Sequence, residues 1–476
     1  MNSKRLKAGG WILFAAVGVA YTAANVYVAR DFWFWWDEIS VTASQSGPLR
    51  GMLYSHIGNW FPLGRLVYAI ETGIFGDSYG WYVAVNCVLI LAICGFVFGQ
   101  LRMFSMSTQG RATWRLLIPI ALLVSYAVSA GNLYNAQWGY QVAWFLSVLT
   151  VVAGTWILTR FNLSFWWYFA VLAIAMLFFA SHIVSIGLTG LALLLLNRKP
   201  VDDSTEQNSP STSTSLVDHL RSTRGQVAAT LVVSGFLLGV AYIAAKAFPP
   251  PDTSLNGTDI KWDYLFQQPT RFFRLLLAAI VNWVITPFSG TTNSFEPRAI
   301  AHGNWFAAHS WIALALLIVV AAIIIFLASP KQSTIEIRLP VGLLVLALLV
   351  FQVTVTIRGF GGLESSVLRR YDPSLLLTIT ILWALLTMSP IRTLLGKFVQ
   401  GAVIALIAIT TIWSFWNFPS AVRNASFHQR ITEADEVNAA LSQCTPNKEF
   451  PPFISIQAPI RGDVCNLWLR FHHQRN

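Results

Sequence analysis

Long runs of apolar residues are the feature that most constrains the fold of this chain. A helix that crosses a bilayer needs about 20 mainly apolar residues, within a range of about 17–25. Because backbone groups in lipid must find hydrogen bonds within the protein, each such run is expected to be helical. The sequence predicts an all-α, multi-pass membrane protein of about 11 transmembrane helices, at 9–29, 79–101, 116–130, 140–158, 164–180, 183–197, 226–247, 305–328, 339–357, 373–389 and 397–416.

Composition and charge agree with a membrane-embedded chain. Only 11% of the 476 residues are charged, whereas a soluble domain carries about 25%. The net charge of +11 is typical of the Lys and Arg excess in cytoplasmic loops, so no nucleic-acid partner is expected. We expect one transmembrane unit at 1–416, with a disordered cytoplasmic linker at about 200–222, and a small extracellular segment at 417–476.

Basic residues in the short loops predict the orientation. Lys and Arg occur at the N-terminus and after the second, fourth, sixth, eighth and tenth apolar stretches, whereas 131–139 and 181–182 contain none. The positive-inside rule therefore puts the N-terminus in the cytoplasm and the first loop, the 248–304 loop, the 358–372 loop and the C-terminus outside. A crossing at 271–288 would reverse the later spans, so we expect that stretch to lie in the outer interface or to re-enter.

Four cysteines separate into two pairs by their surroundings. Cys87 and Cys94 lie in an apolar stretch, where packing is their simplest role. Cys444 and Cys465 lie in the tail that the orientation puts outside, where disulfides persist. A disulfide between these two is therefore predicted, worth about 3 kcal/mol in the entropic model; two free thiols are the alternative.

In the stretch FWFWWDEIS at 32–40, five aromatic residues are followed directly by two acids, Asp37 and Glu38. These acids would be solvated if they simply marked the end of the first span. Next to lipid, however, desolvation raises a carboxyl pKa toward the range that suits a general base. Two adjacent acids could also hold a divalent cation against a phosphate.

Further candidate residues lie in the predicted outer loops, while the spans hold few ionisable groups, so the outer face is the expected place for chemistry. Amides and aromatics suit sugar hydroxyls and ring faces, although an interfacial aromatic belt has the same composition. Arginines bind phosphate in a bidentate manner, although pairing with Glu364, Asp372 or lipid headgroups is the alternative. The candidates are His56, Asn59, Arg65, Gln137, Trp138, Arg358, Arg369, Arg370 and Tyr371.

The order and predicted sidedness of these motifs resemble the GT-C class of membrane glycosyltransferases. That class carries an acidic pair directly after its first span, where this chain has Asp37 and Glu38. Three further stretches resemble segments of such families: HIGNWFPLGRLVYAIETGIFG at 56–76, NAQWGYQ at 135–141 and RRYDP at 369–373. The acidic position varies within the class, and Asp31 is a third acid upstream.

The resemblance implies an inverting hexosyl- or pentosyltransferase of a bacterial plasma membrane. Its donor would be a polyprenyl-phosphate sugar in the outer leaflet, and its acceptor a cell-envelope glycan, lipid or protein. Asp37 would be the general base with Glu38 in support. The divalent cation that these two adjacent acids could hold would be Mg, Mn or Ca. The alternatives are a transporter or flippase of lipid-linked envelope intermediates and a non-catalytic envelope-assembly protein.

Overall fold

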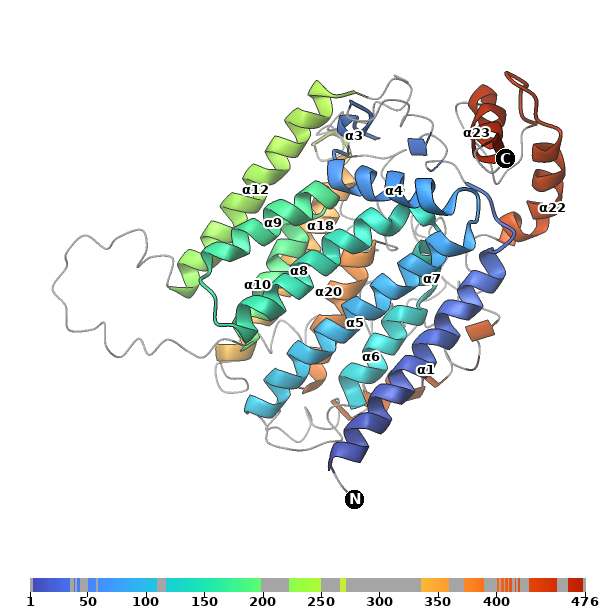
Figure 1. Ribbon diagram of the computed structural model, residues 1–476. Helices are drawn as coiled ribbons and strands as arrows, with labels where there is room; N and C mark the ends of the chain where they lie inside the picture. Colours follow the sequence, from blue (N-terminus) through green and yellow to red (C-terminus); the bar gives the residue numbers. More distant parts are fainter. Residues whose placement is uncertain are drawn as a thin grey trace, which may run out of the picture.

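The computed structural model has a helical architecture throughout the part of the chain that it describes (Figure 1). No strand occurs in that part, and its β-structure is limited to an isolated bridge between His56 and Asn59. The described residues are 3–34, 38, 41–42, 50–56, 59–108, 117–197, 222–249, 266–270, 335–358, 372–388, 428–451 and 461–473, with scattered positions between 400 and 419.

Nine apolar helices lie on nine of the predicted transmembrane stretches. Four of them, α5, α8, α12 and α18, are long and apolar enough to cross a membrane. The predicted spans at 305–328 and most of 397–416 lie outside the described residues, as does the 271–288 stretch, so the total of eleven stays a prediction. The nine helices are α1 Ser3–Ala29, α5 Gly80–Thr108, α6 Leu117–Val128, α8 Val142–Arg160, α9 Trp166–Phe178, α10 Ile183–Asn197, α12 Thr223–Ala247, α18 Ile335–Arg358 and α20 Pro373–Met388.

Helix α10 lies at the centre of the bundle, in contact with α8, α12 and α18, and α18 packs on α20. Glycines allow two of the closest helix approaches. A Cβ at Gly190 would lie 2.4 Å from Val151 Cγ1, and one at Gly154 would lie 2.6 Å from Val171 Cγ1. Helices in membranes associate through such small residues because lipid provides no hydrophobic force between them.

Short elements gather at the end of the bundle that is remote from the N-terminus, which we call the loop end (Figure 1). They are α3 (Arg50–Leu53) and α4 (Pro62–Phe75) in the first loop, and α7 (Ala130–Ala136) and the 3₁₀ helix η2 (Gly139–Gln141) between α6 and α8. The backbone N–H of Ser55 donates to the carbonyl of Phe248 at 2.8 Å, so the end of α12 joins them.

Two C-terminal helices, α22 (His428–Ser442) and α23 (Arg461–His473), lie beside the start of the first loop (Figure 1). The disulfide that the sequence predicts is present between Cys444 and Cys465. Trp468 packs on Trp33 with ring centroids 6.1 Å apart, and Phe471 packs on Phe34 at 5.5 Å. The aromatic run after α1 therefore serves, in its described part, as the surface on which the C-terminal segment docks.

Reducing the disulfide, or replacing Cys444 and Cys465 by serine, should loosen this segment. Its loop spans 21 positions, for which the entropic model gives about 3 kcal/mol. Limited proteolysis should cut between α22 and α23 faster after reduction. The double serine variant is the control, because reductant should not accelerate its cleavage further; equal rates with and without reductant in the parent protein would contradict the expectation.

Candidate functional site

The carboxylate of Glu38 is fully buried at the loop end. Its Oε1 accepts hydrogen bonds from the Tyr79 hydroxyl at 2.7 Å and from the Tyr140 backbone N–H at 3.1 Å. The Tyr79 oxygen in turn accepts from the Gly139 N–H at 3.0 Å. A buried carboxylate needs such partners because it has lost its water. The interpretation of this acid as a solvated helix end is therefore wrong for Glu38.

The turn at 137–140 is fastened to the first two long helices. Asn86 of α5 donates from Nδ2 to the Trp138 carbonyl at 2.8 Å, and Gln137 donates from Nε2 to Oδ1 of Asn25 in α1 at 3.4 Å. Gln137 is fully buried, and Trp138 is half-buried against Tyr140. These contacts hold the Tyr140 N–H in the position from which it donates to the carboxylate of Glu38.

His56 and Asn59 connect the same turn to the α9–α10 connection. Their backbones exchange two hydrogen bonds of 2.9 Å, and both residues are buried. The His56 ring meets the ring of Tyr140 edge-on, with centroids 5.8 Å apart. The Ser181 hydroxyl donates to Asn59 Oδ1. The first loop, the 137–140 turn and the α9–α10 connection thus meet at one place.

Arg65 is buried on the inner face of α4. It donates from Nη1 to the Gly51 carbonyl at 3.4 Å and from Nη2 to the Ser55 carbonyl at 3.3 Å, and its guanidinium lies 5.3 Å from the centre of the Phe61 ring. Burial lowers the pKa of Arg65 to about 10, so it remains a cation at neutral pH. These contacts hold the 51–55 segment, and a phosphate contact of Arg65 stays a prediction.

Glu71 lies on the same face of α4 as Arg65 and is 6% exposed. Among the described residues, neither of its carboxyl oxygens has a hydrogen-bond partner. Burial, and then repulsion by Glu38, raise the pKa of Glu71 to about 8. It is therefore mainly protonated at neutral pH. The sequence carried a signal for this residue, because position 71 follows 64, 65 and 68 at helical spacing.

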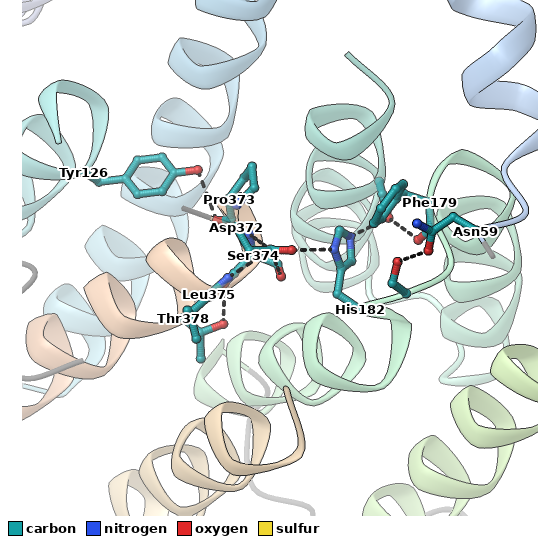
Figure 2. Close-up of polar contacts among 11 residues, drawn as sticks. Asn59, Tyr126, Phe179, His182, Asp372, Pro373, Ser374, Leu375 and Thr378 are labelled. Atoms are coloured by element: carbon teal, nitrogen blue, oxygen red, sulfur yellow. Dashed lines mark hydrogen bonds and ion pairs between the residues drawn. The ribbon is translucent and has the colours of Figure 1, made fainter. Parts of the chain in front are cut away.

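A second polar cluster surrounds His182, as Figure 2 shows. His182 Nδ1 lies 3.4 Å from Asp372 Oδ2, and its Nε2 lies 3.3 Å from Ser147 Oγ. Asp372 also caps α20, because its Oδ1 accepts from the Ser374 N–H at 2.8 Å and from the Ser374 hydroxyl. Burial opposes ionisation of Asp372, but His182 and these hydrogen bonds outweigh it and lower the pKa.

The Asp372 carboxylate only accepts hydrogen bonds, so Nδ1 of His182 is the donor of their contact. The Ser147 hydroxyl lies 3.4 Å from the Phe179 carbonyl and 3.3 Å from Nε2 of His182, so both groups are within its reach. This buried contact joins α20 to the turn before α10, across 190 positions of sequence.

The predicted site residues fall into two groups. The structure brings together Glu38, His56, Asn59, Gln137 and Trp138, with Arg65 on the adjacent helix α4. Asp37, Arg369, Arg370 and Tyr371 lie outside the described residues; Arg358 ends α18, and nothing is described of its side chain. The roles of Glu71, Tyr79, Tyr140, Ser147 and His182 depend on long-range contacts that sequence reasoning missed.

The proposed divalent cation also stays a prediction. Within the described ranges, no group of three or more His, Cys, Asp or Glu residues is placed to hold a metal ion. Glu38, one of its two expected ligands, already accepts two hydrogen bonds at Oε1. The other expected ligand, Asp37, is among the residues that the structure leaves undescribed.

Comparison with known proteins gives no match to a family model, a curated protein or a solved structure. The functional argument therefore depends on the residues and geometry of the loop end.

Replacing Gly139 by alanine should damage the site. The added Cβ would lie 2.9 Å from Tyr82 Cβ and 3.0 Å from Glu38 Oε1, and forced repacking of this kind costs about 1–3 kcal/mol. Thermal unfolding in detergent should show a lower melting temperature. Gly73→Ala is the matched control, because its Cβ meets no atom within 4 Å and alanine favours a helix; equal melting temperatures for both variants would contradict the expectation.

The contact between His182 and Asp372 should appear in a double-mutant cycle. His182→Gln leaves the buried Asp372 carboxylate without its ring partner, and Asp372→Asn removes the carboxylate that the ring contacts. Breaking a buried pair by removing one partner costs about 3–5 kcal/mol. The double variant should lose less than the sum of the two single losses. Ser147→Ala removes a neutral partner and should cost about 1 kcal/mol. Losses that add to within about 0.5 kcal/mol would mean that the two residues do not interact.

Proposed function

We propose that the chain is an inverting membrane glycosyltransferase of the GT-C kind, which takes its sugar from a polyprenyl phosphate. The observation that carries this proposal is the buried carboxylate directly after α1, held by the 137–140 turn beside His56. An acid at this position, walled by aromatic rings and amides, suits the binding and deprotonation of a sugar hydroxyl. The neighbouring acid in sequence is Asp37, the proposed base.

The proposed reaction is a direct displacement at the anomeric carbon. Asp37, supported by the charge of Glu38, takes the proton from an acceptor hydroxyl while that oxygen bonds to the anomeric carbon. The bond from this carbon to the phosphate oxygen breaks, and its electron pair leaves with the polyprenyl phosphate. The phosphate needs no proton because it is already a good leaving group. Arg369 and Arg370, with Arg65 or Arg358, would stabilise the charge that develops on it.

The second cluster supports the participation of the arginines. Asp372 follows Tyr371 directly in the sequence and contacts His182, and the neighbouring Ser181 contacts Asn59 of the first loop. The residue after the arginine-containing segment is therefore linked to the loop that holds His56. This link favours one shared site over two separate functions for the two loops.

In this proposal the loop end faces the outer leaflet of a bacterial plasma membrane, with the N-terminus in the cytoplasm. The long apolar helices α5, α8, α12 and α18 support the membrane location, and the distribution of Lys and Arg in the loops supports the orientation. A donor with a polyprenyl tail would then reach the site from the lipid without leaving the membrane. Membrane lipids and a cell-envelope glycan, lipid or protein acceptor are its other partners.

Asp37→Asn and Glu38→Gln should each lower sugar transfer at least about 100-fold, since general base catalysis contributes about 10²–10⁴-fold. The assay follows radiolabelled glucose, mannose and arabinose from their polyprenyl phosphates into envelope extracts, with purified protein in detergent. Asp31→Asn is the control, because that carboxylate is 62% exposed and pairs with Arg30. Full transfer by both acid variants would sink the proposal; movement of the lipid across vesicles without transfer would favour a flippase.

A further inference from the structure

Helix α4 has its polar residues on the side that faces the protein. Its buried residues are Gly64, Arg65, Tyr68, Glu71 and Thr72, whereas the side chains of Ile70 and Ile74 are 51% and 71% exposed. A surface helix of a soluble protein shows the reverse arrangement, with its apolar face toward the core. An apolar outer face suits contact with lipid, and the polar inner face needs partners inside the protein.

On this inner face, neither carboxyl oxygen of Glu71 has a hydrogen-bond partner in the described part of the chain, and the same holds for the Tyr68 hydroxyl. Glu71 interacts electrostatically with Glu38, from the segment after α1, and with Tyr82, from α5. The Tyr82 hydroxyl donates to the Gly76 carbonyl at 2.7 Å, so it is already engaged. A buried carboxyl that lacks a protein partner is suited to a polar ligand.

A neutral hydroxyl group fits Glu71 better than a metal ion. The pKa of about 8 leaves Glu71 protonated at neutral pH, so it can donate one hydrogen bond and accept another. A cation would require its ionised form, which burial and the charge of Glu38 disfavour. The rings of Tyr68 and Tyr82, 5.9 Å apart, supply the aromatic surroundings that sugar rings favour.

We propose that Glu71 is a binding residue for a hydroxyl group of the transferred sugar. This inference rests on the proposed glycosyltransferase function. It adds that Glu71 is the residue by which the site distinguishes a sugar-bearing polyprenyl phosphate from a sugar-free one. Glu71 acts on binding and not on the proton transfer.

The test compares Glu71→Leu and Glu71→Gln with the parent protein in detergent. The probes are polyprenyl phosphates of glucose, mannose and arabinose, with sugar-free polyprenyl phosphate as the reference. We expect at least one sugar-bearing lipid to bind the parent at least about 10-fold more tightly than the reference, which corresponds to about 1.4 kcal/mol. Glu71→Leu should abolish this preference and keep the affinity for the sugar-free lipid, and Glu71→Gln, which still donates and accepts, should keep part of it.

Kinetics separates this role from a structural one. If sugar transfer is observed, Glu71→Leu should raise the KM for the donor about 10-fold or more and change kcat less, whereas a folding defect would lower the fraction of active protein. Glu436→Gln is the control, because Glu436 is exposed on α22. Parent-like preference for the sugar in Glu71→Leu overturns the inference and leaves the proposed function standing. Loss of preference, together with normal transfer by the Asp37 and Glu38 variants, overturns the function instead.

The stability of the free protein supplies an independent check on the state of Glu71. Its folded-state pKa lies above its ordinary value of 4.5, so the folded protein keeps a proton that the unfolded chain loses. Stability should therefore fall as the pH rises from about 4.5 to about 8 and level off above. Glu71→Gln removes this loss, so it should raise the melting temperature more at pH 8 than at pH 5. The same difference at both values would show that Glu71 is not a buried acid.

Discussion

The loop end depends on the hydrogen bonds that the buried carboxylate of Glu38 accepts. This carboxylate has left water, so it requires hydrogen bonds from groups that are themselves fixed. Tyr79 and the Tyr140 N–H provide them, and each comes from a segment anchored to a long helix. The first loop and the 137–140 turn are thereby held together, and the close approach at Gly139 leaves no room for a larger residue.

Around this contact the molecule separates two kinds of polar group. One kind is satisfied within the protein, as in the cluster of His182, Asp372 and Ser147, which joins α20 to the N-terminal helices. The other is held without such partners in the described structure, as Glu71 is on the inner face of α4. The first kind gives the site a fixed frame. The second kind lowers the stability of the folded protein locally, and proteins retain such groups where a ligand binds.

Sequence patterns predict much of the scaffold and part of the site. Apolar runs gave the positions of the described long helices, because the requirement for internal hydrogen bonds in lipid leaves few other conformations. The sequence predicts the disulfide between Cys444 and Cys465 because both lie in the polar C-terminal tail, and the disulfide is present. The polar face of α4 could be seen in its spacing, but the importance of Glu71 could not, since its missing partner is a property of the surroundings.

The sequence by itself determined the class of fold, the segments that are helical and the polar loops in which chemistry would be sought. Tertiary structure decided which residues of those loops meet: it buried Glu38 on the 137–140 turn and joined His182 to Asp372. It also used Trp33 and Phe34 to dock the C-terminal helices. The physical reason is that periodicity and hydropathy are local, whereas desolvation of a carboxylate and pairing of a charge depend on groups distant in the chain.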